Sequence, residues 1–477
     1  MAVRFLRITV LLLFALLIVG PSSAQDNRYS ELSYGTEATL LNGAVIGRTL
    51  DMSAAFYNPA GIATIDNPSL VLGAHTYEYG GVKINGTDEY TQEPLSVGST
   101  SLRPAPSFIG GTIPFSSLGR HRIAYSVLTR QTAEARIAYR QGVEENGQRI
   151  QLEYLNENDL SENWVGLSWA YGFSDKAAVG ATMFTAVRSQ LLRRQITGQV
   201  LHEDNSVGLA SGINEFKYDS WRIVPKLGAM FAINPLTLGA TVTVPSIGLF
   251  GGGSALYNAT STGIDFDGDG APDPGLAANY QEDVASDFSS GLSIGVGAAL
   301  DIDRTTIFAS AEWYAERGPT RVLETDPFLS QSSGEPLTND LILKSKAVVN
   351  GALGFRHKFS DTLSGYLSAA TDFTSIDTTN SVSVGRTPWD LYHFGGGAKL
   401  TINRLQLVLG GAYASGGTDI ETDSVAGLPL LQATTVNVTE RGFRFLIGFE
   451  FGFGKDGDAE AGAGADPGTA PPNDAGS

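Results

Sequence analysis

The stretch GFRFLIGFEFGFG, residues 442–454, decides the fold because a large apolar residue occupies every second position. The apolar series is Phe443, Phe445, Ile447, Phe449, Phe451 and Phe453. Side chains of a strand point alternately to opposite faces, whereas a helix would scatter this series around its circumference. The stretch therefore predicts a strand with one apolar and one mixed face. Such a strand fits a soluble β-sandwich, or a membrane barrel whose apolar face meets lipid.

The composition favours the barrel. The chain of 477 residues contains 57 Gly, 23 Phe and 17 Tyr, which is typical of strands and of aromatic girdles at a membrane surface. A formal net charge of -18 argues against a nucleic-acid partner, because the protein could not neutralise phosphates. The absence of cysteine excludes disulfides and thiol chemistry.

Residues 1–24 have the pattern of a secretory signal peptide. Arg4 and Arg7 precede an apolar run at 8–19, and residues 22–24 form a small-residue cleavage site. The run is too short to span ~30 Å of hydrocarbon, and no later stretch approaches ~18 uninterrupted apolar residues. We therefore expect either a soluble protein outside the cytoplasm or a barrel.

Alternating runs fill residues 68–454, joined in turn by tight turns and by longer polar loops, which is the asymmetry of outer-membrane barrels. Fourteen strands are predicted at 68–84, 102–115, 121–142, 148–173, 176–202, 211–232, 236–250, 281–300, 304–319, 340–358, 362–376, 387–401, 404–420 and 436–454. The expected fold is all-β, a 14-stranded antiparallel transmembrane β-barrel in the lipid of a bacterial outer membrane. Both chain ends then lie on the periplasmic side. Residues 455–477 are acidic and rich in Gly, Ala and Pro, which predicts a disordered tail.

Charged residues alternate with the apolar series on two of these strands. Arg222 and Lys226 lie opposite an apolar face within 221–233, and Arg444 and Glu450 do so near the C-terminus. In a barrel these four side chains face the lumen. They could bind the head group of a ligand, although buried charges more often pair with each other or with a plug.

The segment 35–63 contains Asn58-Pro59-Ala60-Gly61 and resembles the N-terminal signature of the FadL/TodX family of outer-membrane transporters for hydrophobic compounds. In that family an Asn-Pro-Ala element lies in a hatch that plugs a fourteen-stranded barrel, and Asn58, Pro59 and Ala60 match it. A barrel of this size is also too wide for its own side chains to fill. Residues 25–67 are thus expected to be a hatch in the lumen, with a flexible periplasmic leader as the alternative.

The resemblance implies a channel for uptake of hydrophobic compounds, such as long-chain fatty acids or aromatic hydrocarbons, past the hatch and sideways through the wall. Binding would rest on burial of apolar area, at about 25 cal/mol per Å². The match places an outer ligand groove after the seventh strand, although 247–250 could simply continue that strand. The groove residues would be Leu249, Phe250, Leu256 and Tyr257.

Two other roles remain open, a FadL-like barrel serving type IX protein secretion and a general porin. One departure concerns the C-terminus. Family members commonly end in an aromatic residue that the barrel-assembly machinery reads, whereas this chain continues beyond Phe453.

Pro225 lies in the middle of the alternating strand 211–232. Proline has no N–H for the ladder, and a closed barrel has no free edge to tolerate its absence. We expect a bulge or kink at this point, which would be either a sideways exit or a relief of barrel curvature.

The loop 265–273 resembles part of a calcium-binding loop. Asp265, Asp267, Asp269 and Asp273 fall at positions 1, 3, 5 and 9 of such a loop, but Leu276 stands where a bidentate Glu is expected. A structural Ca²⁺ site in an extracellular loop and a solvated acidic loop both remain open.

No enzymatic site is expected. The five histidines fall in no recognised nucleophile motif, and no G-x-S-x-G stretch occurs.

Overall fold

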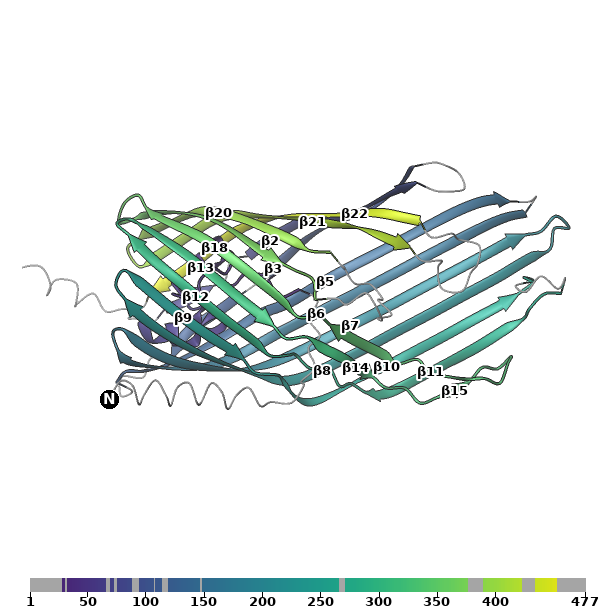
Figure 1. The fold of residues 1–477 in the computed structure, drawn as a ribbon, viewed down its shortest axis with the longest axis horizontal. Helices are drawn as coiled ribbons and strands as arrows, with labels where there is room; N and C mark the ends of the chain where they lie inside the picture. The colour runs from purple at the N-terminus through teal and green to yellow at the C-terminus, as the bar shows by residue number, and fades with distance from the viewer. Residues whose placement is uncertain are drawn as a thin grey trace, which may run out of the picture.

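In the computed structural model the strands form one closed antiparallel barrel (Figure 1). The structure describes residues 28–30, 32–65, 69–72, 75–87, 94–106, 108–113, 119–145, 148–265, 271–375, 389–422 and 434–452. Within these ranges, eighteen sheet elements make fourteen barrel strands, because four barrel strands are each split in two. The predicted fold class is therefore confirmed.

The barrel strands, in order, are β1 (Ser69–Leu72) with β2 (His75–Thr87), β3 (Pro94–Pro106) with β4 (Phe108–Ile113), β5 (His121–Glu145), β6 (Gln148–Ser174), β7 (Ala177–Leu201), β8 (Val207–Ile233), β9 (Leu236–Thr243) with β10 (Ile247–Thr262), β11 (Gly275–Ala285) with β12 (Ser293–Ile302), β13 (Thr305–Tyr314), β18 (Val348–Lys358), β19 (Leu363–Asp372), β20 (Leu391–Ile402), β21 (Leu405–Thr422) and β22 (Thr434–Gly452). β22 closes the ring, since it pairs with β21 on one side and with β1 and β2 on the other.

The alternation that predicted the last strand separates the two faces of the wall. Phe443, Phe445, Ile447, Phe449 and Phe451 are 40–59% exposed on the outside. Leu446, which alternates with them, is 2% exposed and faces the interior. The outer face of the barrel is therefore apolar, and the buried residues lie within the ring.

Several predicted strands differ from the structure in their bounds. The ninth ends at Tyr314 instead of 319, and the tenth begins at Val348 instead of 340. The seventh was expected to end at 250, but it breaks at 244–246 and resumes as β10, which runs to Thr262. The eighth was expected over 281–300, but it begins at Gly275 and breaks at 286–292. The range 251–280 was predicted as a loop, yet Gly251, Gly252 and Gly253 pair with β8 in the ladder. A Cβ at Gly253 would lie 3.1 Å from the Leu323 side chain, so a small residue is needed there.

Among the described residues, two neighbouring strands of the wall, β3 and β5, are not paired with each other. β4 pairs with β5 from Phe108↔Leu128 to Ile113↔Ile123. Beyond that point β3 pairs with β2, and β5 pairs with β6. No described pairing joins β3 to β5, so the backbone groups along these two facing edges are not bonded to one another.

Strand length varies strongly around the ring. β5, β6, β7 and β8 have 25 to 27 residues each, whereas β13 and β19 have 10. The wall is therefore taller on one side of the ring, and in Figure 1 the long strands β5–β8 extend to the right beyond β13, β18 and β20.

The helical turns α2 (Glu37–Leu40), α3 (Ala54–Tyr57) and η2 (Pro59–Thr64) belong to the N-terminal segment. In the part of the chain that the structure describes, no helix has the length and apolar character needed to cross a membrane. Residues 1–24 and 455–477, where a signal peptide and a tail are predicted, lie outside the described residues.

Candidate ligand passage

Residues 28–65, called here the N-terminal segment, lie inside one end of the barrel (Figure 1). Tyr34, Leu41, Met52 and Ile62 are fully buried there. They pack in one cluster with inward-facing wall residues, which include Phe184, Val224, Phe308 and Leu446. The segment thus shares a hydrophobic core with the barrel wall at this level.

Asn58 organises the chain at the motif that sequence reasoning selected. Its side chain accepts a hydrogen bond from the N–H of Ala60 at 3.2 Å, which caps η2. Its amide also donates to the carbonyl oxygens of Ile46 at 2.8 Å and Ala229 at 3.1 Å. Because Ala229 belongs to β8, one side chain fixes the local turn and ties it to the wall.

Four wall glycines receive the backbone of the N-terminal segment directly, and we call them the glycine floor. A Cβ added at any of them would lie within 3.0 Å of that segment, which real contacts do not allow. The floor and the residues that each member meets are Gly180 with Pro59, Gly228 with Asn58 and Pro59, Gly239 with Ile46, and Gly297 with Gly47. Gly61 of the motif must also be small, because a Cβ there would collide with the Thr49 side chain of the same segment. At Gly180, Gly239 and Gly297 the wall therefore packs against backbone atoms of the segment, whereas at Gly228 the nearest atom is the side-chain oxygen of Asn58.

Ion pairs tie the N-terminal segment to separate parts of the ring. Arg28 pairs with Glu440 of β22 at 3.0 Å, and Arg48 pairs with Asp301 of β12 at 2.6 Å. Glu37 at the start of α2 pairs with a lysine of β20. These contacts distribute the attachment over much of the circumference.

Within the segment, buried Asp51 joins two turns. Its carboxylate accepts hydrogen bonds from the backbone N–H groups of Thr36, Glu37 and Ser53 at 2.8–2.9 Å. Nearby, burial raises the pKa of Tyr57 above its ordinary value, so the phenol stays neutral and accepts from the N–H of Tyr34. The segment is therefore internally ordered as well as anchored.

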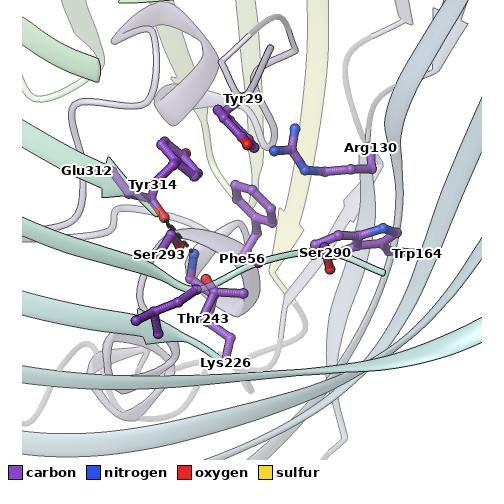
Figure 2. Close-up of a pocket in the computed structure, with 12 residues that line it drawn as sticks. Tyr29, Phe56, Arg130, Trp164, Lys226, Thr243, Ser290, Ser293, Glu312 and Tyr314 are labelled. Atoms are coloured by element: carbon purple, nitrogen blue, oxygen red, sulfur yellow. Dashed lines mark hydrogen bonds and ion pairs between the residues drawn. The ribbon is translucent and has the colours of Figure 1, made fainter. Parts of the chain in front are cut away.

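A small cavity lies beside the N-terminal segment (Figure 2). Its volume is about 30 Å³, which is room for one or two water molecules. An organic ligand would need its walls to move. The lining residues are Tyr29, Phe56, Arg130, Trp164, Lys226, Thr243, Ser290, Gly291, Leu292, Ser293, Glu312 and Tyr314.

The cations around this cavity are held by aromatic faces and by one carboxylate. The Lys226 ammonium lies 4.7 Å from the centroid of the Phe56 ring and 3.8 Å from a carboxylate oxygen of Glu312. The Arg130 guanidinium lies 5.7 Å from both the Phe56 and Trp164 ring centroids. Aromatic rings and cations together line the space, which suits a ligand with an apolar body and a polar end.

A buried charge cluster lies on the wall next to this cavity. Glu162 is bonded to Arg188 at 2.7 Å and also to Arg222, and all three side chains are almost completely buried. The Phe288 ring lies against both guanidinium groups, with centroid distances of 4.1 Å to Arg188 and 4.4 Å to Arg222. Phe288 belongs to residues 286–292, which interrupt the eighth strand and which we call the gate segment.

No protein-family model and no curated protein matches this sequence. Among solved structures, a Pseudomonas aeruginosa FadL homologue matches with a TM-score of 0.59 and 14% identity, over 91% of this chain and 100% of that one. The P. putida toluene transporter TodX matches with a TM-score of 0.58 and 14% identity, over 89% and 99%. A TodX deltaS2S3 mutant monoaromatic hydrocarbon channel gives a TM-score of 0.61 at 14% identity, over 88% and 99%.

This chain has the FadL fold.

The FadL fold places the four predicted lumen charges on the inner face of the wall. Arg222 and Lys226 are buried, and Arg444 and Glu450 are partly buried. Arg222 is engaged by Glu162, and Lys226 faces Glu312. These two cations are therefore already paired, which was one of the two outcomes that the sequence left open.

The residues proposed for an outer groove lie on a strand. Leu249 and Phe250 are exposed on the outer face of β10, where Phe250 stacks on Trp221 with ring centroids 5.2 Å apart. Leu256 and Tyr257 are partly buried further along β10. All four residues therefore lie on β10, two near its start and two further along, and they are not gathered in a loop.

Pro225 leaves its own strand unbroken. β8 runs through it in register with β7, and Pro225 faces Met183. The interruption appears in the neighbouring strand, at 244–246, where the Val244 N–H donates to the Pro225 carbonyl at 2.9 Å. The expected irregularity is present, but on the strand beside the proline.

The acidic loop is only partly within the described residues. Asp265 and Asp273 are described, whereas Asp267 and Asp269 lie outside the described residues. Among the residues that the structure places, no cluster of three or more His, Asp or Glu side chains could hold a metal ion. Calcium binding stays a prediction from the sequence.

Sequence reasoning missed the glycine floor and the Glu162 cluster. The floor glycines occupy inward positions on β7, β8, β9 and β12, so an inward glycine recurring on neighbouring strands was an available signal. Glu162 gave no such signal, because only the register of β6 on β7 brings it opposite Arg188.

Proposed function

We propose that this chain is an outer-membrane channel through which hydrophobic organic compounds diffuse into the cell. The observation that carries the proposal is a FadL-fold barrel with an apolar outer face and an ordered N-terminal segment packed into its lumen. The apolar face suits lipid. The packed lumen favours a gated channel over an open porin, because the N-terminal segment shares a hydrophobic core with the inner face of the wall.

The N-terminal segment acts as the hatch in this proposal. Its contacts with the wall are ion pairs, hydrogen bonds and close packing without covalent links, so it can rearrange while the barrel stays intact. Among solved FadL-fold structures, TodX is named as a toluene transporter and, as a deletion mutant, as a monoaromatic hydrocarbon channel. The ligand class for this chain is accordingly an apolar molecule, with an aromatic or alkyl body.

Release occurs sideways between β3 and β5. Support comes from the missing ladder between these strands, since neighbouring strands elsewhere in that part of the wall are continuously paired. An apolar molecule leaving there would enter lipid without crossing water, which avoids the cost of exposing its surface again.

Uptake assays test the function. Cells that produce the protein should accumulate toluene or a fatty acid several-fold faster than cells without it, while liposomes containing it should not swell in sugars. Sugar permeation would instead indicate a porin. Secretion of a protein substrate without uptake of either compound would favour the secretion role.

A cross-link tests the exit. The chain has no cysteine, so a cysteine at Ser101 of β3 can be combined in turn with cysteines at 133, 135 and 137 of β5. A barrel bridged there by a short bifunctional reagent should lose most of its uptake, because the two edges can no longer separate.

The matched control bridges an existing ladder, with cysteines at Thr132 and Ser161, which face each other across β5 and β6. It should leave uptake unchanged. Full uptake through a barrel bridged between β3 and β5 would rule out this exit. The break at 244–246 beside Pro225 would then be the remaining candidate for a sideways exit.

A further inference from the structure

Residues 317–345, called here the lid, leave the barrel sheet between β13 and β18 and pack against the inner face of the wall. The lid contains β14 (Arg317–Leu323) paired with β17 (Leu341–Ser345), and a short hairpin of β15 (Phe328–Leu329) and β16 (Pro336–Leu337). It forms small sheets outside the barrel sheet. In Figure 1 it lies toward the end opposite the N-terminal segment.

One face of the lid is apolar and covers the inner wall. Its buried residues are Val322, Leu323, Leu341 and Leu343. They share a hydrophobic cluster with inward-facing wall residues, which are Leu192, Phe216, Tyr218, Ala255 and Val284. The opposite face carries Arg321, whose side chain is 57% exposed. The lid is therefore amphipathic, and the wall beneath it is an apolar surface covered by the chain itself.

The lid joins β11 and the gate segment without a continuous ladder. Ser286 of the gate segment forms an isolated bridge with Leu323, and the Ser332 N–H donates to the Leu276 carbonyl of β11 at 3.0 Å. In addition, the Gln281 amide donates to and accepts from the backbone of Asp326, both at 2.8 Å. The Gln331 amide pairs in the same way with Ala278. Such contacts can be exchanged with water more readily than a continuous ladder.

The lid also holds the gate segment. The Asp287 N–H donates to the Val322 carbonyl at 2.9 Å. The Arg317 guanidinium donates to the carbonyl and, at 2.8 Å, to the hydroxyl of Ser289. Ser289 directly follows Phe288, whose ring lies against the guanidinium groups of Arg188 and Arg222. Movement of β14 would therefore pull on the residue that covers this charge cluster.

We propose that the inner wall beneath the lid is a binding site for the alkyl or aromatic body of a ligand, and that a ligand bound there displaces the lid and withdraws Phe288. This site rests on the proposed function. Its occupant in this structure is the lid, whose aliphatic side chains stand where the ligand would pack. Arg317 is a positioning residue that transmits the displacement to the gate segment.

Amide hydrogen exchange on the full barrel in lipid nanodiscs tests the site, with toluene and dodecanoate as probes. Each bound probe should speed exchange at least tenfold both in β14 and in the gate segment. Arg317→Gln should uncouple them, so that β14 still responds tenfold and the gate segment responds less than twofold. Arg321→Gln, on the same strand but directed away from the gate segment, should preserve both responses.

Probe binding is measured in parallel by equilibrium dialysis against nanodiscs without protein. Binding without faster exchange in β14 would overturn the site and leave the proposed function standing. A gate segment that still responds tenfold in Arg317→Gln would overturn the transmission. No binding of either probe above lipid alone would overturn the proposed function, and the site with it.

Discussion

Replacing Gly228 by valine should raise the single-channel conductance of the barrel by about tenfold or more, because the N-terminal segment can no longer seat on the wall. A Cβ at this position would lie within 3.0 Å of Asn58 and Pro59. The new side chain would displace the turn that Asn58 holds. Overpacking of this kind costs about 1–3 kcal/mol at a well-packed contact. Planar lipid bilayer recordings on purified protein measure the change.

Gly212 supplies the matched control, since it lies on the same strand and a Cβ there meets nothing within 4 Å. Gly212→Val should conduct as the unmodified barrel does. If Gly228→Val assembles normally and shows the same conductance as Gly212→Val, the N-terminal segment does not close the lumen.

Replacing Glu162 by alanine should destabilise the barrel by about 3–5 kcal/mol, because it leaves two buried guanidinium groups without their carboxylate. The measurement is denaturant unfolding of the purified barrel in detergent micelles. The effect falls on stability first, since Arg188 and Arg222 would have to recruit water or shift within a closed wall.

Glu215→Ala is the comparison, because Glu215 faces Arg193 at 3.7 Å and both side chains are partly exposed. Exposed pairs of this kind contribute about 0.2–1 kcal/mol. Changing all three cluster residues together, Glu162→Leu with Arg188→Met and Arg222→Met, should recover much of the loss. Equal unfolding midpoints for Glu162→Ala and Glu215→Ala would contradict the assignment.

Period-two alternation made most of the barrel predictable. The outward series at 443–451 sits on a surface that must be apolar at every second residue, so the pattern survives in the sequence. The turns at 174–177 and 233–236 were also predictable from the sequence, because a tight turn interrupts the alternation for only a few residues.

The interior was less predictable because it depends on residues that meet only in the folded chain. Gly228 and Asn58 are far apart in sequence, and no local sequence pattern predicts that they are in contact. The gate segment has no alternation of its own, so it was included in a long strand. Residues 317–345 were predicted as the end of one strand, a loop at 320–339 and the start of the next strand, since an amphipathic hairpin folded inward resembles an ordinary loop in composition.

The unequal strand lengths affect where an apolar ligand would first contact the barrel. A strand of 27 residues is about 90 Å long at ~3.4 Å per residue. Tilted by about 40°, it rises about 70 Å, whereas the apolar band of an outer-membrane barrel is about 25 Å tall. In the proposed outer-membrane channel, the wall on its tall side would therefore extend tens of ångströms beyond the bilayer. A molecule that dissolves poorly in water would travel that distance in contact with protein.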